Sequence, residues 1–309
     1  MTLVSIVTPC FNEEDNLEEL HERIRLVMSG LKKYKYEHLV IDNASTDRSA
    51  EVLRGLAKKD KHLRVIINTR NFGHIRSPYH AILQARGDIV IALASDLQDP
   101  PERIPEFVAR WEDGYKVVIG VKNRSEEPGL FYFLRTIYYR GLRALSDVPL
   151  IENFTGFGLY DRAVLDVIRG INDPYPYFRG LIADLGFNRA EIVFTQPRRK
   201  RGISKNNFYT LYDLAMLGIT NHTKIPLRLA AMFGFFSAAI SFLIGFAYLI
   251  YKLIFWFEFS LGSAPLVIGL FFLGSVQLMF LGIVGEYIGA IYTQVMHRPL
   301  VIEKERINF

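Results

Sequence analysis

An apolar segment that ends in acidic and amide side chains is the first place in this chain where the residue types suggest chemistry. Residues 91–102 read IALASDLQDPPE, so that Asp96, Gln98 and Asp99 directly follow an uncharged run. Apolar runs bounded by turn residues are typical of buried strands, and ligands of open α/β sheets bind outside the carboxyl ends of such strands. Mg²⁺ and Mn²⁺ prefer oxygen ligands, and Mg²⁺ usually shares one or two carboxylates with substrate phosphates. We therefore expect Asp96 and Gln98 to bind Mg²⁺ or Mn²⁺ together with a diphosphate.

Asp99 has a simpler explanation than metal binding. It precedes Pro100, and Glu102 lies three residues further along the chain. A polar capping residue, a proline at the first helical position and a glutamate in the first turn are together typical of a helix start. We interpret Asp99 as a helix cap, and Asp47 as a second candidate cap.

A second carboxylate is expected at the same edge of the sheet. Asp42 closes the segment EHLVID, residues 37–42, just as Asp96 follows the apolar segment at 88–94. A single acidic residue after a strand is usually a helix cap, but the carboxyl ends of parallel strands meet at one edge. The segment after the first strand, residues 8–16, contains no glycine, which argues against a dinucleotide-binding fingerprint, and the sequence contains no P-loop pattern.

Alternating strands and helices are predicted to position these side chains. Segments typical of strands begin at Leu3, Glu37, Leu63, Asp88 and Lys116. Between the first three of them, apolar residues recur at helical spacing, at 17–27 and 52–56. This alternation predicts an α/β fold with a mainly parallel sheet and helices on both of its faces.

The last third of the chain differs in composition from the rest. Apolar residues make up 50% of the 309 residues, and two long uncharged stretches lie at 229–251 and 264–285. Each exceeds the ~20 residues that span a bilayer core, whereas buried helices of soluble proteins rarely stay uncharged for so long. We therefore expect two transmembrane helices. Basic residues favour the side that carries both chain ends, which the positive-inside rule places in the cytoplasm.

The expected organisation has four parts: a cytoplasmic domain at 1–205, an amphipathic segment at 206–226, two transmembrane helices within 227–292 and a cytoplasmic tail at 293–309. The amphipathic segment either lies in the membrane interface or packs on the soluble domain. Cys10 is the only cysteine, which excludes an intrachain disulfide. The net charge of +5 suits anionic lipid or phosphate partners, and we expect no nucleic-acid partner. Gly285 and Gly289 would permit close packing of helices, as in a homo-oligomer.

A basic cluster precedes the amphipathic segment, in QPRRKRGISK at 196–205. One interpretation is a nonspecific anchor for anionic lipid headgroups, worth about 1 kcal/mol per charge. The other is specific binding of phosphate groups. We expect both: residues 198–200 mainly anchor, whereas Arg201 and Lys205, which occupy positions of the RGISK motif in the family resemblance described below, engage phosphates. The candidates for binding phosphate or lipid phosphate are Arg124, Arg198, Arg201 and Lys205.

Six motifs in fixed order give the chain a resemblance to a known family. They are IVTPCFNEEDNL, VIDNASTDRS, RNFGH, SDLQDPPE, YPYFRGL and RGISK, followed by the two apolar stretches. In this order they resemble family 2 glycosyltransferases that charge polyprenyl phosphate, above all the bactoprenol glucosyltransferases of O-antigen modification. Dolichol-phosphate mannose synthase is a more distant relative. The resemblance covers nearly the whole chain.

The resemblance implies a GT-A fold and a role for each motif. The nucleotide-binding residues that it implies are Pro9, Asn12, Glu13 and Asp42, with Asp42 in contact with the uridine. Asp96 and Gln98 would bind the metal on the donor diphosphate. The catalytic groups that it implies are Asp96, Arg201 and Lys205. From the residues alone, Asn12 could instead cap the first helix, and Pro9 could merely end a strand.

Two positions depart from the family pattern. Relatives usually have an aspartate where this chain has Ala94, and some have an acidic residue near Gly156. The first departure bears on metal affinity and the second on a general base. A phosphate monoester needs little base catalysis, because with a second pKa near ~6 it is largely dianionic at neutral pH.

These observations predict an inverting, metal-dependent hexosyltransferase of the cytoplasmic (inner) membrane. It would move a hexose, with UDP-glucose the expected donor, to polyprenyl phosphate for modification of a cell-surface glycan such as lipopolysaccharide. A processive polysaccharide synthase is disfavoured, because the Q-x-x-R-W motif is absent and two spans are few for a translocation channel. The alternative from another class is a noncatalytic membrane scaffold that kept the fold.

Overall fold

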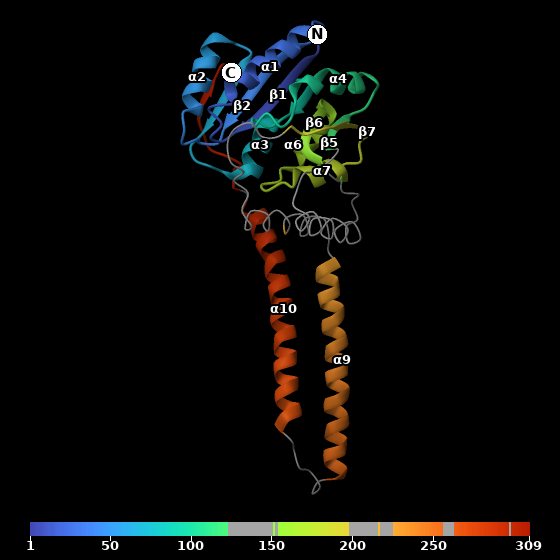
Figure 1. The fold of residues 1–309 in the computed structure, drawn as a ribbon. Coiled ribbons are helices and arrows are strands. Elements are labelled where there is room, and N and C mark those ends of the chain that lie inside the picture. Colours follow the sequence, from blue (N-terminus) through green and yellow to red (C-terminus); the bar gives the residue numbers. More distant parts are fainter. Residues whose placement is uncertain (123–150, 152–153, 198–215, 217–224, 256–262, 297) are drawn as a thin grey trace.

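The computed structural model describes residues 1–122, 151, 154–197, 216, 225–255, 263–296 and 298–309. It consists of an α/β head from which two long helices project side by side (Figure 1). The strands are β1 (Leu3–Cys10), β2 (Lys35–Asp42), β3 (Leu63–Asn68), β4 (Ile89–Ala92), β5 (Val117–Lys122), β6 (Phe154–Asp161), β7 (Arg189–Phe194) and β8 (Glu303–Ile307). The helices are α1 (Leu17–Gly30), α2 (Ser49–Lys59), α3 (Gly73–Gln84), η1 (Pro101–Arg103), α4 (Ile104–Glu112), α6 (Arg162–Ile171), α7 (Phe178–Asp184), α9 (Ile225–Ile254) and α10 (Ser263–Val295).

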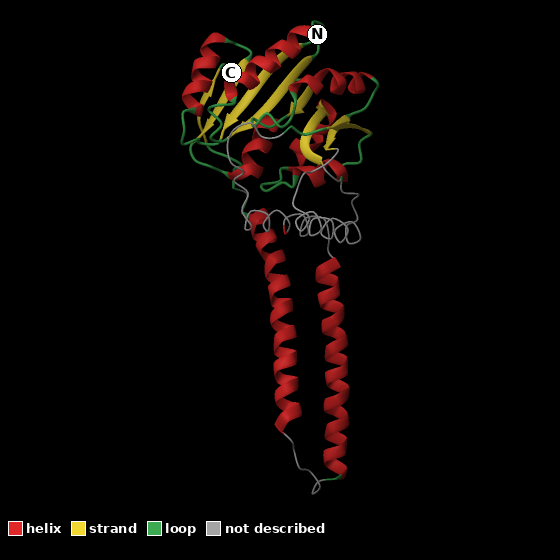
Figure 2. Cartoon of the chain, in the orientation of Figure 1, coloured by secondary structure: helices red, strands yellow, loops and turns green. Residues whose placement is uncertain are grey.

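The strands of the head form one sheet of eight strands in the order β7-β5-β6-β4-β1-β2-β3-β8. β1 pairs in parallel with β2 and β4, β2 with β3, and β5 with β7. Antiparallel pairs join β6 to β4 and β5, and β8 to β3. Figure 2 shows the sheet in yellow with helices on both faces. The predicted α/β fold with a mainly parallel sheet is therefore confirmed, and the five predicted strands are present.

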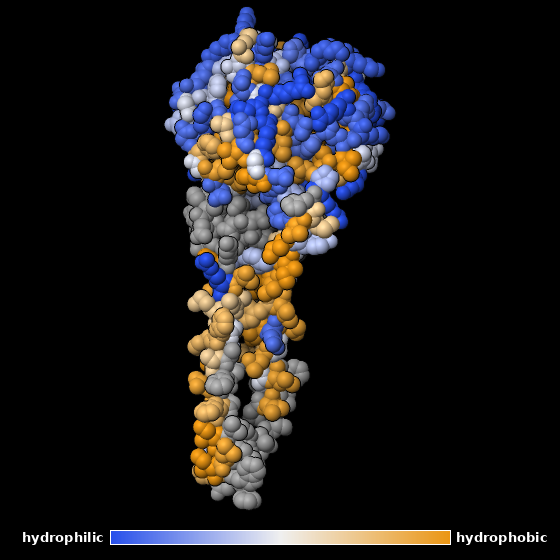
Figure 3. Space-filling model, turned by 180° about the vertical axis from the view of Figure 1, so that it is seen from behind, coloured by the Kyte–Doolittle hydropathy of each residue, from blue (hydrophilic) through white to orange (hydrophobic). Residues whose placement is uncertain are grey.

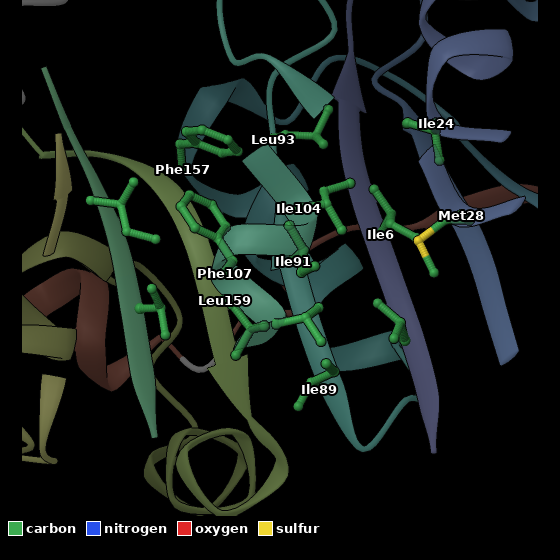
Figure 4. Close-up of a cluster of buried hydrophobic side chains, with 14 of the residues drawn as sticks. Ile6, Ile24, Met28, Ile89, Ile91, Leu93, Ile104, Phe107, Phe157 and Leu159 are labelled. Carbon is green, nitrogen blue, oxygen red and sulfur yellow. The ribbon is translucent and has the colours of Figure 1, made fainter. Parts of the chain in front are cut away.

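Hydrophobic clusters cover both faces of the sheet, because successive side chains of a strand point to opposite faces. Ile6 of β1 packs with Ile91 of β4 and with apolar side chains of α1 and α4 (Figure 4). The next residue, Val7, belongs to a separate cluster with α3, α6 and α7. Since both faces are covered by helices, the central strands are apolar along nearly their whole length.

The chain end after α10 returns to the head as strand β8. Glu303–Ile307 pairs antiparallel with β3, the outermost of the parallel strands on that side. The Arg54 guanidinium of α2 contacts Glu305 at 2.7 Å, and the Asn308 side chain donates to the carbonyl of Ala57 at 2.7 Å. The sequence analysis predicted no strand in this part of the chain. The chain that follows α10 is thus bound to the head by strand pairing and by side-chain contacts.

Helices α9 and α10 expose large apolar side chains along their length. Phe235 of α9 is 78% exposed and Leu278 of α10 is 71% exposed. Figure 3 shows apolar side chains over most of the two helices and a mainly hydrophilic surface on the head. Over the part of the chain that the structure describes, one stretch, Phe272–Val295, is long and apolar enough to cross a membrane, whereas Ile225–Ser237 is shorter. Of the two predicted transmembrane helices, only the second, in α10, is therefore supported by its length and composition.

Candidate active site

The carboxyl ends of four parallel strands bring the predicted site residues to one edge of the sheet. In the register of the sheet, Cys10 of β1 lies beside Asp42 of β2, and Val7 of β1 lies beside Ala92 of β4. The loops that follow these strands therefore leave the sheet next to one another. The structure confirms the expectation that the segments carrying Asp42 and Asp96 share an edge.

Asn12 connects the loop after β1 to the loop after β2. Its backbone is left-handed, with φ of +57°, a conformation that asparagine tolerates better than most residues. Its side-chain oxygen accepts the Thr46 N–H at 2.7 Å, and its own N–H donates to the Ser45 hydroxyl at 2.8 Å. Helix α1 begins five residues later, at Leu17, so Asn12 ties two loops together and does not cap that helix.

Asp42 is a buried carboxylate held by one neighbour. Its side chain is among the most buried polar groups, and the residue is 1% exposed. The Ser45 hydroxyl donates to one carboxylate oxygen at 2.5 Å, and the Ser45 N–H donates to the other at 3.2 Å. Burial raises the pKa of Asp42, and the two hydrogen bonds from Ser45 oppose that rise. The Asn12 N–H and the Asp42 carboxylate therefore meet at one hydroxyl group.

Glu13 and Pro9 lie beside this pair. Glu13 is buried, its carboxylate accepts from the Asn16 amide at 2.6 Å, and its N–H donates to the Ser49 hydroxyl at 3.0 Å. Pro9 lies within β1, paired with Ile41 of β2, and is half-buried. The N-cap residue of α2 is Arg48, which makes no side-chain cap bond, but the Asp47 carboxylate before it accepts the N–H of Ser49, the first residue of α2, at 2.9 Å.

Cys10 ends β1 beside Asp42, but it is not a candidate nucleophile. Its thiol is buried, and burial together with the nearby Asp42 carboxylate raises the pKa well above its usual range. A thiol reacts as the thiolate, which this environment disfavours.

The loop after β4 alternates buried and half-buried residues. Leu93, Ser95 and Leu97 are buried, whereas Asp96 and Gln98 are half-buried. Leu97 adopts a left-handed backbone with φ of +61°, an uncommon conformation for leucine. The Gln98 N–H donates to the Asp96 carboxylate at 3.2 Å. Because Leu97 is buried, the carboxylate of Asp96 before it and the amide of Gln98 after it lie at the accessible edge of the sheet.

The predicted role of Asp99 as a helix cap is wrong. Its carboxylate accepts the N–H of Ala94, five residues back, at 3.0 Å, and neither η1 nor α4 has a side-chain cap at its described start. The residue is buried, and burial, with a further contribution from the Asp96 charge, raises its pKa to about 6. Asp99 closes the loop that carries Asp96, because the Ala94 N–H needs an acceptor inside the protein.

The oxygen ligands of this loop fit a cation that is shared with a bound phosphate group. Across the described residues, no group of three or more His, Cys, Asp or Glu side chains could enclose a metal ion. Asp96 and Gln98 supply only hard oxygen atoms, and the Asp96 charge already disfavours ionisation of Asp99 nearby. Mg²⁺ typically binds through one or two carboxylates and completes its shell with water and substrate phosphates. The donor set is consistent with that mode and not with an all-protein metal cage.

Four predicted phosphate-binding residues, Arg124, Arg198, Arg201 and Lys205, lie outside the described residues, as does nearly all of 206–224. The Gln98 side chain does reach the segment that leads to the basic cluster, because its amide donates to the carbonyl of Pro197 at 3.3 Å. Sequence reasoning missed another set of residues at this edge: the asparagines Asn43, Asn68 and Asn71 hydrogen bond to one another. A polar residue at the end of an apolar strand, as in LRVIIN, is the signal that could have identified Asn68.

The head has a GT-A-like α/β fold, with a mainly parallel sheet whose carboxyl edge carries acidic and amide side chains. This is the class of scaffold on which nucleotide-sugar-dependent transferases are built. The sequence model described as glycosyl transferase family 2 matches residues 5–169, just over half of the chain. The chain belongs to this family.

Similarity to individual relatives extends through the helical pair. The chain is 33% identical to the bactoprenol glucosyl transferase of Shigella phage SfV over 97% of its own length and 98% of the relative. It is 30% identical to a prophage bactoprenol glucosyl transferase homolog of Escherichia coli K12, again over 97% and 98% of the two chains. An uncharacterized glycosyltransferase of Bacillus subtilis is 35% identical over 96% of this chain and 92% of its own. The protein is a glycosyltransferase of the hexosyltransferase class.

Proposed function

We propose that this protein transfers a hexose from a nucleotide sugar, with UDP-glucose the expected donor, to polyprenyl phosphate. The observation that carries the proposal is the juxtaposition of a buried carboxylate, Asp42, and a loop of accessible oxygen ligands at one edge of the sheet. It occurs in a chain that resembles bactoprenol glucosyl transferases along nearly its whole length. The product would be a polyprenyl-phosphate sugar used to modify a cell-surface glycan.

On this proposal the donor nucleotide binds over the ends of β1 and β2. Asp42 accepts a hydrogen bond from the uridine, and Pro9, Asn12 and Glu13 line the pocket. The Ser45 hydroxyl fixes the Asp42 carboxylate from the side of the protein. A hydrogen-bond donor on the ligand would stabilise the buried Asp42 carboxylate, because a buried charge with too few hydrogen-bond partners raises the free energy of the protein.

Asp96 and Gln98 would hold Mg²⁺ or Mn²⁺ against the donor diphosphate. A divalent ion there supplies charge that neutralises the departing diphosphate. Arg201 and Lys205 would add fixed positive charge, with Arg124 and Arg198 as further contacts to phosphate or lipid phosphate. The acceptor phosphate is largely ionised at neutral pH, so its oxygen attacks the anomeric carbon opposite the nucleotide with little help from a base. The anomeric configuration is inverted.

The membrane arrangement is part of the proposal. α9 and α10 would cross the cytoplasmic membrane as a two-helix hairpin, with the head and both chain ends in the cytoplasm and residues 206–226 in the interface. The exposed apolar side chains of both helices support this arrangement, and so does the return of the chain to the head in β8. A Cβ atom added at Gly285 or Gly289 would meet nothing within 4 Å, which leaves room for a helix of a second copy in a homo-oligomer.

The direct test incubates the purified full-length protein with polyprenyl phosphate and a panel of radiolabelled nucleotide sugars, with added Mg²⁺ or Mn²⁺ or with a chelator. We expect one nucleotide sugar to give labelled lipid when Mg²⁺ or Mn²⁺ is present, and no labelled lipid when a chelator is present. Asp42→Asn serves as a matched variant that keeps the size of the side chain and removes its charge. Transfer from no donor would overturn the proposal and favour a noncatalytic scaffold.

A second test addresses the topology. Reporter fusions at Phe309 and in the connection near residue 260 should give opposite signals, because one lies on the cytoplasmic side and the other outside. Identical signals at the two positions would overturn the two-span arrangement while leaving the transferase proposal intact.

A further inference from the structure

Asn43, the residue after Asp42, has a buried side chain whose hydrogen-bonding capacity is completely used. It is 6% exposed. Its amide nitrogen donates to the Asn71 side-chain oxygen at 2.8 Å and to the Gly73 carbonyl at 3.1 Å. Its side-chain oxygen accepts the Phe72 N–H at 2.9 Å and the Asn68 amide at 3.1 Å. An asparagine amide has two donors and two acceptor lone pairs, and each is engaged here.

These contacts determine the shape of the segment that follows β3, which we term the Thr69–Gly73 loop. Asn71 turns back on this loop, where its side-chain oxygen also accepts the Gly73 N–H at 2.7 Å. Gly73 has φ of +86°, which a residue with a side chain would rarely adopt, and it begins α3. The buried Phe72 carries the Arg70 guanidinium over its ring at 4.0 Å. Removing the Asn43 side chain would release Asn71, Phe72 and Gly73 together.

The other hydrogen bonds of Asn43 attach it to β1 and to the end of β3. Its N–H donates to the carbonyl of Cys10 at 2.9 Å, which continues the pairing of β2 with β1 past Asp42. Asn68, which bonds to the Asn43 oxygen, is 1% exposed and also donates to the Ser77 hydroxyl of α3 at 3.1 Å. Asn43 therefore links the end of β2 to β1 through its backbone, and to β3 and the start of α3 through its side chain.

We propose that Asn43 is a positioning residue for the donor, which holds the Thr69–Gly73 loop in a fixed place beside Asp42 before the nucleoside diphosphate binds. This inference rests on the proposed function, in which Asp42 contacts the nucleotide. A loop that had to become ordered on binding would lose conformational freedom at each of its residues, and affinity for the donor would fall accordingly. Asn43 acts through the loop and through Asp42 and touches no reacting atom.

The test compares three variants of the full-length protein in detergent. Asn43→Ala removes the whole set of contacts. Asn71→Ala removes one of them from an exposed residue, so that it keeps the inference testable if Asn43→Ala does not fold. Leu53→Ala is the matched control, because it lowers stability from a buried position in α2, in a core cluster that includes none of residues 69–73. The readouts are the Kd for UDP, the KM for each substrate, kcat and the exchange rate of the Phe72 amide hydrogen.

We expect Asn43→Ala to raise the Kd for UDP and the donor KM by about 10-fold, the scale of one or two lost buried hydrogen bonds. The KM for polyprenyl phosphate and kcat at saturating donor should stay close to wild type, and the Phe72 amide should exchange faster. Asn71→Ala should change the same quantities less, and Leu53→Ala should lower the melting temperature without changing the donor KM.

An unchanged Kd in both loop variants would overturn the inference, and so would a donor KM that follows melting temperature alone across all three variants. Failure of the proposed function itself is recognised in a different place. In that case wild-type protein binds neither UDP nor any other nucleoside diphosphate, and the positioning role falls with it.

Discussion

The two halves of the carboxyl edge of the sheet differ in the burial and the hydrogen bonds of their predicted site residues. In the half over β1, β2 and β3, which we call the nucleotide side, Asn12 and Asn43 hydrogen bond to neighbouring loops, and Asp42 accepts from Ser45 of its own loop. In the half after β4, which we call the metal side, Asp96 and Gln98 are half-buried around the buried Leu97. On the proposed function, the nucleotide side would be formed before the donor binds, and a metal ion with the donor phosphates would join Asp96 and Gln98 on the metal side.

The sheet explains part of this difference. β1 and β2 are eight-residue strands paired in parallel over their whole length, so that their ends lie in a fixed register beside each other. β4 has only four residues, and its other neighbour, β6, runs antiparallel and ends at the opposite edge. The loop after β4 therefore lies between the end of β1 and the first residues of β6, which precede the Gly158 that pairs with Ala92. Asp99 supplies the acceptor that closes it.

The largest effect is expected on the metal side, from Asp96→Asn. This change keeps the size of the side chain but removes the charge offered to the cation, so turnover should fall by about 100-fold or more. Excess Mg²⁺ or Mn²⁺ should recover only part of the activity, and the Kd for UDP without metal should not change. Turnover measured against metal concentration checks this. Full activity in Asp96→Asn, or a wild-type enzyme indifferent to a chelator, would show that the metal side has been misassigned.

The support beneath the nucleotide side should weaken in acid. His38 of β2 is buried, with its ring nitrogens 3.1 Å from the Thr8 hydroxyl and 3.0 Å from His21. Burial, followed by the charge of His21, lowers the pKa of His38 to about 3. The unfolded chain would bind a proton near pH 6.5 and the folded one would not, so stability falls as pH drops below about 6.5, by up to about 1.4 kcal/mol per pH unit.

Melting temperatures of full-length protein between pH 7 and pH 5 measure this effect, against His38→Asn as the comparison. The variant should have a flatter pH dependence, with the remainder coming from His21, whose pKa burial also lowers. An equal slope in wild type and variant would show that His38 does not titrate on unfolding in this range.

A smaller effect is expected from Ser45→Ala on the nucleotide side. The change removes the donor to Asp42 and the acceptor for the Asn12 N–H, so donor affinity should fall by about 5–10-fold. The pKa of Asp42 should rise further, because the lost hydroxyl bond from Ser45 lowers it and only the Ser45 N–H bond remains. The Asp42 carboxylate of the variant would then ionise at higher pH, so the donor KM should reach its lowest value at a higher pH than in wild type. Thr46→Ser is the matched control, since it keeps both the N–H that donates to Asn12 and the hydroxyl that accepts from the Asn12 amide at 3.0 Å. A similar KM change in both variants would argue against a specific role for Ser45.

The nucleotide side was the more predictable half of the edge. Strand ends follow from runs of apolar residues, so the position of Asp42 could be derived from EHLVID alone, and parallel pairing then placed it beside the loop that contains Asn12. The roles of the nucleotide-binding residues still came from the family motifs and stay predictions. The Asn43 contacts were not predicted, because an asparagine after a strand is equally common in an ordinary turn.

The sequence was less informative where contacts depend on distant parts of the chain. Asp99 has every local feature of a cap, but the backbone turns at Leu97 and directs its carboxylate to Ala94. β8 was missed because EKERI is polar and lacks the apolar pattern of a strand. It forms because the exposed edge of β3 offers backbone partners and Arg54 pairs with Glu305. Neither partner is visible in the local sequence.

The smallest effect is expected from Ala94→Asp, which restores the aspartate that relatives usually have. Ala94 is half-buried like Asp96 and Gln98, so a carboxylate there should join the metal side. The metal concentration needed for half-maximal activity should fall by a few-fold, roughly 0.5–1 kcal/mol of binding energy, while kcat changes little.

In a chelator the variant should be less stable than wild type, because a third carboxylate adds repulsion where the Asp96 charge already raises the pKa of the buried Asp99. Ala94→Asn, of the same size but uncharged, should change neither quantity in this way. If Ala94→Asp and Ala94→Asn need the same metal concentration for half-maximal activity, residue 94 does not face the cation and an aspartate there would not be a metal ligand.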